Sequence, residues 1–204
     1  MIAIIDYGLG NIRAFANIYK KLDVPFKVAH TTQDLQDVSK IILPGVGAFD
    51  YAMGQLEASG MRPKLEELVL EKKVPVVGIC VGMQMLARTS DEGQLPGLGW
   101  LDAQVKKFDE HSIQYATHLP HMGWNDVVPV KENKILTELE KDAKFYFLHS
   151  YYFHCNVADD IIAVTDYGVK FSCAVNKENI YGVQFHPEKS HQYGIQLLKN
   201  FADL

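Results

Sequence analysis

The sequence contains few cysteines, no long apolar run and no excess of positive charge. Its three cysteines are an odd and sparse set among 204 residues, so we predict no disulfide framework and a reducing, cytoplasmic location. The formal net charge of −5 gives no electrostatic reason to expect a nucleic-acid partner. The longest apolar stretch, 74–86, is too short and too interrupted to span a bilayer, and the N-terminal decapeptide lacks the basic start of a secretory signal. No membrane partner is expected.

The composition fits a globular protein with enough apolar residues for a core. Hydrophobic residues make up 48% and charged residues 22% of the chain, which is the usual profile of a soluble globular protein. A length of 204 residues favours one domain, spanning 1–204, that is large enough to bury a core without crosslinks.

The order of the predicted elements indicates an α/β fold. In the first half, short apolar strands (2–5, 26–29, 40–45 and 75–79) alternate with helical segments (12–22, 49–60 and 61–73). This alternation predicts a mostly parallel central sheet flanked by helices. In the second half, strands follow one another quickly, which predicts added antiparallel strands at 98–108, 124–130, 144–153, 161–167, 169–175 and 179–185, before a closing helix at 193–204.

Cys80 stands between two glycines directly after the predicted strand 75–79. In α/β folds, active groups gather at the carboxyl ends of the parallel strands, and Gly78-Ile-Cys-Val-Gly82 matches the Gly-x-nucleophile-x-Gly elbow. The helix that follows would favour a thiolate and offer amides to an oxyanion. The alternative is a cysteine that packs as a small apolar side chain. Cys155 and Cys173 have no such elbow, and we predict that they are inert.

A base and its orienting group are predicted in the segment YGVQFHPEKS, at 181–190. His186 follows the predicted strand 179–185, and Pro187 restricts the backbone before Glu188. The Glu188 carboxylate could accept from one imidazole nitrogen while the other nitrogen faces the thiol. The alternative is an ordinary His–Glu pair on the surface.

The remaining signal is LPGVG, at 43–47, where a strand ends at a proline and two glycines. Such a loop could aim a peptide N–H at an oxyanion, although an ordinary turn has the same composition. No dinucleotide cofactor is predicted, because DYGLGN at 6–11 lacks the third glycine of that motif. No metal is predicted at His118, His121, His149 or His154, since Pro120 interrupts helical spacing and no zinc motif is present.

Taken together, LPGVG, GICVGMQ and YGVQFHPEKS closely resemble the triad-type, class I glutamine amidotransferases in order and spacing over nearly the full chain. Within that family the sequence is most similar to the glutaminase subunits of imidazole glycerol phosphate synthase, on the segments DYGLGN, LPHMGWN (119–125), FYFLHSYY (145–152) and QFHPEKS. The resemblance implies that the chain hydrolyses L-glutamine to glutamate and ammonia. The ammonia would pass to a cyclase partner, a (β/α)8 barrel, in a heterodimer of histidine biosynthesis.

The resemblance also implies a role for each site residue. Cys80 matches the nucleophile, His186 the general acid/base and Glu188 the group that orients the imidazole. A carboxylate such as Glu92 suits an α-amino group, and backbone N–H donors suit an α-carboxylate. The implied glutamine-binding residues are Gly47, Gln84, Glu92, Ser150 and Tyr151, the oxyanion residues are Gly45, Val46, Gly47 and Val81, and the partner-interface residues are Pro120, Met122, Trp124 and Asn125.

Three alternatives remain open. The segment 10–22 differs from the usual helix of the histidine-pathway subunits and is similar to a sister group from bacterial surface-sugar gene sets. The partner would then be a sugar amidotransferase that forms an amidine. The second alternative is a stand-alone cysteine hydrolase, although such relatives lack the late His-Pro-Glu. The third is a non-catalytic subunit, which would not need an intact Cys80, His186 and Glu188. Trp124 is predicted at the interface, with packing in the core as its alternative, and the lone chain is expected to be nearly idle.

Overall fold

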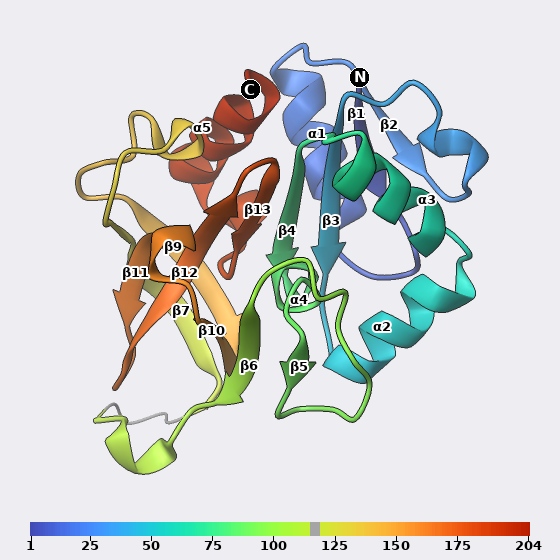
Figure 1. Cartoon of the computed structure of the whole chain (residues 1–204). Coiled ribbons are helices and arrows are strands. Elements are labelled where there is room, and N and C mark those ends of the chain that lie inside the picture. Colours follow the sequence, from blue (N-terminus) through green and yellow to red (C-terminus); the bar gives the residue numbers. More distant parts are fainter. Residues whose placement is uncertain (115–118) are drawn as a thin grey trace.

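The computed structural model describes residues 1–114 and 119–204. Within these residues the largest sheet has eight strands, which in spatial order are β2 (Phe26–Ala29), β1 (Ile2–Ile5), β3 (Lys40–Gly45), β4 (Val76–Cys80), β13 (Ile180–Val183), β12 (Lys170–Lys177), β11 (Ile161–Asp166) and β8 (Val128–Pro129) (Figure 1). The first five strands run parallel, and the last three are antiparallel to their neighbours. This is the predicted arrangement of a mostly parallel sheet with antiparallel additions.

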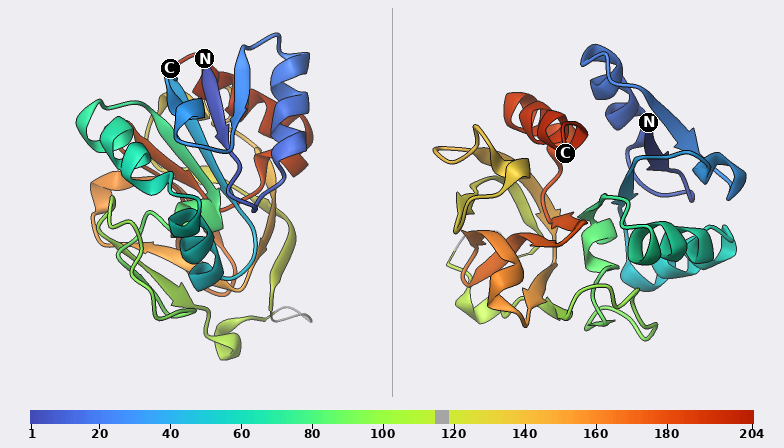
Figure 2. Two further views of the ribbon diagram at one scale, coloured as in Figure 1. Left: turned by 90° about the vertical axis from the view of Figure 1, so that its right-hand side faces the viewer. Right: turned by 45° about the horizontal axis from the view of Figure 1, so that its top comes forward.

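The central strands are apolar throughout because helices cover both faces of the parallel part. Every residue of β1, β4 and β13 is buried. Helices α1 (Ile12–Lys21) and α5 (His191–Ala202) lie together on one face, whereas α2 (Phe49–Ala58) and α3 (Arg62–Glu66) lie on the other (Figure 2). The predicted helix 61–73 continues from α3 into a π-helical turn, η2 (Glu67–Glu71).

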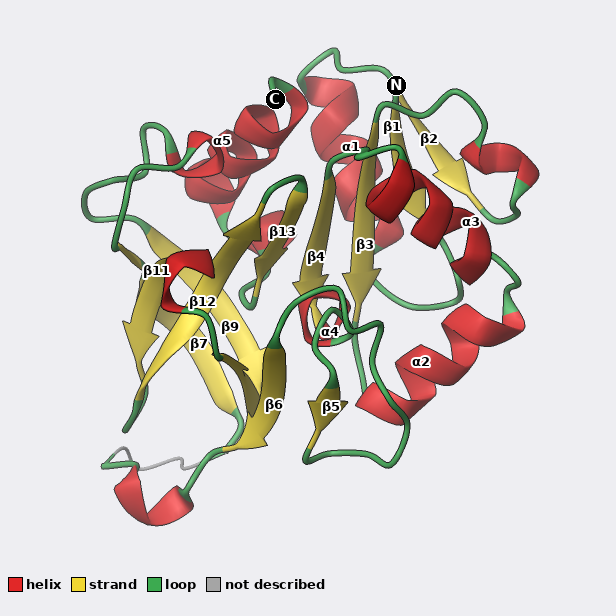
Figure 3. Cartoon of the chain, viewed as in Figure 1, coloured by secondary structure: helices red, strands yellow, loops and turns green. Residues whose placement is uncertain are grey.

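The second half builds two smaller sheets beside the large one (Figure 3). One contains β10 (Tyr151–Cys155), β6 (Ala103–Lys107) and β5 (Thr89–Ser90), and the other pairs β7 (His121–Asp126) with β9 (Lys144–His149). The remaining short helical elements are α4 (Val81–Gln84), η1 (Gln33–Leu35), η3 (Glu110–Ser112), η4 (Lys134–Leu136), η5 (Ala158–Asp160) and η6 (Pro187–Lys189).

Two of the predicted strands are wrong because the chain changes sheets within them. The segment 144–153 forms β9 and β10, which pair with β7 and β6 respectively, with Ser150 between them. The segment 124–130 is likewise divided between β7 and β8. The predicted strand 98–108 is shorter, since only β6 is extended, and β5 was not predicted.

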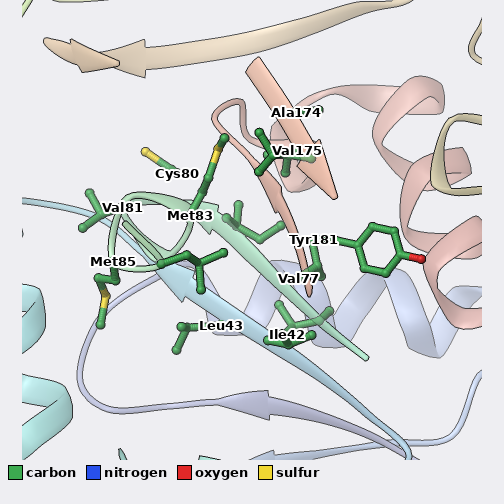
Figure 4. Close-up of a cluster of buried hydrophobic side chains, with 14 of the residues drawn as sticks. Ile42, Leu43, Val77, Cys80, Val81, Met83, Met85, Ala174, Val175 and Tyr181 are labelled. Carbon is green, nitrogen blue, oxygen red and sulfur yellow. The ribbon is translucent and has the colours of Figure 1, made fainter. Parts of the chain in front are cut away.

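The core extends along β3, β4 and β13 and reaches Cys80 at the carboxyl end of β4. Figure 4 shows Ile42, Val77, Met83 and Tyr181 in one buried cluster that also includes Cys80. All three cysteines are buried and free. Of the helices in the described part of the chain, none is both long and apolar enough to cross a membrane.

Candidate active site

Cys80 occupies a strained turn between β4 and α4. Its backbone has φ 54° and ψ −112°, a region that side chains other than glycine rarely adopt. A Cβ on Gly78 would lie 2.6 Å from the carbonyl oxygen of Gly82, and a Cβ on Gly82 would collide with the carbonyl oxygen of Leu43. Both glycines are therefore needed for the close approach of α4 to the strands, as the elbow motif predicts.

His186 and Glu188 form a buried pair at the same edge of the sheet. Strand β13 runs parallel to β4, so the segment that follows it reaches the carboxyl end of β4, and η6 places the two side chains together. The Nδ1 atom of His186 lies 2.9 Å from Oε1 of Glu188, and the two side chains are 2% and 1% exposed. The structure thus brings together all three residues of the predicted triad.

The charge state of His186 is set by its partners. Burial lowers its pKa, but hydrogen bonds to Cys80 and Glu188, together with the negative charges of both groups, outweigh burial and raise the pKa to about 10. These partners favour the imidazolium form of His186 beside the sulfur. A cation in this position can stabilise a sulfur nucleophile and later donate a proton to a leaving group.

Two glutamine side chains connect the Cys80 sulfur to the backbone at Tyr151. Gln184 is fully buried, and its Nε2 lies 3.7 Å from the Cys80 sulfur. Nε2 of Gln84 donates to Oε1 of Gln184 at 3.0 Å and to the carbonyl oxygen of Tyr151 at 3.0 Å. The prediction missed Gln184, although a buried amide next to an apolar strand end is a signal that could have found it.

A cavity of about 250 Å³ opens over the sulfur, and its lining residues are Val46, Gly47, Cys80, Val81, Gln84, Glu92, Pro120, Leu148, His149, Ser150, Tyr151, His186 and Lys189. It lies just below the usual range of roughly 300–1,000 Å³ for ligand pockets, which suits a single small metabolite. All five residues predicted to bind glutamine line this cavity.

The predicted oxyanion residues divide into two groups. Val46, Gly47 and Val81 line the cavity, and Gly47 has φ +101°, which glycine alone adopts without strain. Gly45 lies instead inside β3, paired with Cys80, where a Cβ would come 2.6 Å from the Gly82 nitrogen. Its role in the structure is therefore close packing. The Tyr7 hydroxyl donates to the Pro44 carbonyl at 2.7 Å and anchors the start of the loop.

Glu92 presents its carboxylate to the cavity from the loop after β5. Its Oε2 accepts from the Phe49 N–H at 2.9 Å, at the start of α2. Burial raises the pKa of this half-buried carboxyl, and the Phe49 hydrogen bond opposes that rise. A positively charged amino group in the cavity would supply the counter-charge that this carboxylate needs.

Strand β7 separates the predicted interface residues onto two faces. Met122 and Trp124 point outward and are 60% and 46% exposed, so the alternative that Trp124 packs in the core is wrong. Pro120 is partly buried and lines the cavity. Asn125 faces the other way, because its Nδ2 donates to the Asp166 carbonyl at 2.9 Å and lies 3.2 Å from Nε2 of His121.

The histidines considered for metal binding serve other purposes or lie elsewhere. In residues 1–114 and 119–204, no three His, Cys, Asp or Glu side chains come together as ligands. His121 and His149 are hydrogen-bonded to each other at 3.0 Å. His154 is exposed on β10, and His118 lies outside the described residues.

The chain belongs to the class-I glutamine amidotransferase family, since the model of "Glutamine amidotransferase class-I" matches residues 3–204. More particularly, it is 58% identical to the imidazole glycerol phosphate synthase subunit HisH of Bdellovibrio bacteriovorus, over 100% of both chains. It is 52% identical, again over 100% of both, to the protein of the same name from Leptospira interrogans. The resemblance predicted from the sequence is confirmed.

Solved structures support the fold. A crystal structure of a glutamine amidotransferase has a TM-score of 0.73 at 17% identity, covering 100% of this chain and 99% of that one. PurLQS from Thermotoga maritima has a TM-score of 0.70 at 17% identity, with 99% and 97% coverage. The predicted fold class is confirmed by these likenesses.

Proposed function

We propose that the chain is the glutaminase subunit of an imidazole glycerol phosphate synthase in histidine biosynthesis, and that residues 1–204 form a single glutaminase domain in the cytoplasm. The observation that carries the chemistry is the strained Cys80 elbow facing the buried His186–Glu188 pair over a small cavity. The histidine-pathway assignment is supported by full-length identities of 58% and 52% to subunits of that name.

The reaction proceeds in two covalent steps at Cys80. Its sulfur attacks the side-chain amide carbon of glutamine, and His186 gives a proton to the departing nitrogen, which leaves as ammonia. Water then attacks the thioester, with His186 as the base, and releases glutamate and the free sulfur. Glutamine and water are thus converted to glutamate and ammonia, and Glu188 keeps the imidazole in one orientation throughout.

Different cavity residues bind the different groups of glutamine. Glu92 takes the α-amino group, and the backbone at Ser150 and Tyr151 takes the α-carboxylate. N–H groups of the Val46–Gly47 loop and of Val81 stabilise the oxyanion that forms on the amide carbonyl. A cavity of about 250 Å³ suits a single amino acid, which favours glutamine over a polypeptide as the substrate.

Ammonia released into solvent would be protonated and lost, so the chain should act with an acceptor enzyme docked over the cavity. Met122 and Trp124 are large exposed apolar side chains on the strand that pairs with the cavity wall, since Met122 is opposite Leu148. Such a pair suits an interface anchor. We propose a cyclase subunit with a (β/α)8 barrel as the partner in a heterodimer.

The test is to measure glutamine hydrolysis and glutamine-dependent imidazole glycerol phosphate formation by the chain with and without the cyclase subunit of the same organism. We expect the lone chain to be nearly idle. Full activity alone, unchanged by the cyclase, would refute the coupling. Activation by a sugar amidotransferase, with none by the cyclase, would establish the alternative partner.

The contribution of β7 is tested with a pair of matched variants. Trp124→Ala should weaken cyclase affinity by roughly tenfold or more, as truncation of a central aromatic anchor does. Leu70→Ala removes another exposed apolar side chain, 41% exposed on η2, and should leave the affinity unchanged. Equal affinities for both variants would remove Trp124 from the interface and leave the glutaminase assignment standing.

A further inference from the structure

Two buried histidines that the proposed reaction does not use lie at the cavity wall, one of them, His149, among its lining residues. His121 on β7 and His149 on β9 are 3% and 7% exposed and are opposite one another in the strand register. Nδ1 of His121 lies 3.0 Å from Nε2 of His149, and Nδ1 of His149 lies 2.7 Å from the carbonyl oxygen of Tyr151. At the other end, Nε2 of His121 lies 3.2 Å from Nδ2 of Asn125.

The two ends of this chain of hydrogen bonds require the same tautomers. A carbonyl oxygen can only accept, so Nδ1 of His149 must carry the proton, and its Nε2 must accept from Nδ1 of His121. The Asn125 amide nitrogen is a donor, as its bond to the Asp166 carbonyl shows, so Nε2 of His121 must accept. All contacts are satisfied when both rings are neutral and protonated at Nδ1, and an added proton would leave two donors facing each other.

Aromatic side chains hold the two rings in this arrangement. His121 is stacked between Phe147 and Tyr167, with ring centroids at 4.7 Å and 4.0 Å. Phe171 packs edge-on against His149 at 5.4 Å. Burial lowers the pKa of His121 to about 4 and that of His149 to about 3, which agrees with neutral rings. Such a cage fixes the rings and leaves them no counter-charge.

The inner end of this chain of hydrogen bonds meets the active site at the carbonyl oxygen of Tyr151. The Tyr151 carbonyl oxygen accepts from His149 and also from Nε2 of Gln84 at 3.0 Å. Gln84 in turn bonds Gln184, whose amide reaches the Cys80 sulfur. The backbone at Ser150, where β9 gives way to β10, is therefore held from both sides while it lines the cavity.

We propose that His121 and His149 are positioning residues which, as a neutral relay running from Asn125 to the Tyr151 carbonyl, hold the Ser150–Tyr151 backbone in the geometry that binds the amino-acid end of glutamine. The proposal rests on the proposed function, because it takes this cavity as the glutamine site. It does not assign either histidine a part in proton transfer.

The experiment measures alkylation of Cys80 by a diazoketone analogue of glutamine, in which the sulfur displaces dinitrogen, as a function of the analogue concentration. The half-saturating concentration reports recognition, and the limiting rate reports the reactivity of the sulfur. Iodoacetamide, which lacks the amino-acid end, serves as the parallel probe. If the two histidines served only to pack the structure, their replacement would change the half-saturating concentration and the limiting rate together.

We expect His149→Leu and His121→Leu to raise the half-saturating concentration roughly tenfold, as the loss of a buried hydrogen bond would do. His149→Leu removes the bond to the Tyr151 carbonyl, and His121→Leu removes the donor that fixes His149. The limiting rate and the iodoacetamide rate should change less than about twofold, since these variants leave Cys80 and His186 in place. His121→Gln, which offers one donor and one acceptor, should restore most of the recognition. Asn125→Leu, at the half-buried outer end of the chain of hydrogen bonds, should give a smaller change of the same kind.

Phe171→Leu is the matched control, because it removes a ring packed against His149 and leaves the relay intact. The proposal would be overturned if the two histidine variants had half-saturating concentrations no higher than that of Phe171→Leu. It would also be overturned if their rate of labelling by iodoacetamide fell as much as their rate of labelling by the glutamine analogue. A wild-type chain that iodoacetamide labels at Cys80 but the glutamine analogue does not would instead overturn the proposed function, and this inference with it.

Discussion

The histidine beside Cys80 and the His121–His149 pair on β7 and β9 are buried to nearly the same degree, yet only His186 is held in the charged form. His186 is 2% exposed and its pKa is raised to about 10, whereas His121 and His149 are 3% and 7% exposed and have pKa values of about 4 and about 3. Burial acts on all three in the same direction. The difference comes from the partners. His186 is hydrogen-bonded to a carboxylate and a sulfur, whereas the pair has only neutral hydrogen-bond partners, and the nearby charge of His186 lowers the pKa of His149 further.

The comparison separates two uses of one side chain within a small region. A residue that carries a proton needs a charged partner to hold the proton until the substrate takes it. A residue that holds a backbone carbonyl needs a fixed tautomer, which a neutral and enclosed ring provides.

The largest effect is expected when the sulfur is removed. Cys80→Ala should abolish glutaminase activity, and the pKa of His186 should fall because Glu188 alone remains to favour the cation. NMR titration of the imidazole measures the second effect. Cys155→Ala and Cys173→Ala should keep most of the activity, since burial raises the pKa of both thiols. Turnover retained by the Cys80 variant would contradict the assignment.

The next effect separates the proton carrier from its orienting group. His186→Ala should lower turnover by several orders of magnitude, and Glu188→Gln by less, because an amide can still hold the ring in place. Steady-state kinetics of both variants in the complex measures the difference. A greater loss for Glu188→Gln would mean that the two roles are wrongly assigned.

The triad of Cys80, His186 and Glu188 was predictable from the sequence, because its residues belong to motifs at strand ends. The bounds of β1 and β3 are those predicted, and Cys80, His186 and Glu188 meet at the expected edge of the sheet. Local patterning predicts these positions, since buried parallel strands are short apolar runs bounded by polar or turn residues.

The hydrogen-bonded pair of His121 and His149 could not be predicted from the sequence. His121 and His149 are 28 residues apart and meet only through the register of β7 and β9. The strand-like segment 144–153 contains no proline or glycine that would mark the change of sheet at Ser150. The side-chain direction of Asn125 depends on the alternation along β7. These features follow from long-range pairing, which single-sequence patterns do not encode.

The smallest expected effect is on stability as a function of pH, and it has opposite signs for the two groups. The unfolded pKa of histidine is about 6.5. For His121 and His149 the folded pKa is lower, so acidification protonates the unfolded chain first, and their contribution is full above pH 6.5 and lost as the pH falls toward 4 and below. For His186 the folded pKa is higher, so its contribution is full below pH 6.5 and lost as the pH rises toward 10.

The variant His121→Gln isolates one of these groups. The free energy of unfolding of the wild type should fall more steeply than that of the variant between pH 6.5 and pH 4, by up to about 1.4 kcal/mol per pH unit for one proton. Urea unfolding at a series of pH values measures both slopes, and carboxylates cancel because they are common to both proteins. His111→Gln, at an exposed position in η3, should keep the wild-type slope. Parallel curves for wild type and His121→Gln would show that His121 titrates alike in the folded and unfolded chain, and the contrast with His186 would then rest on the His149 ring alone.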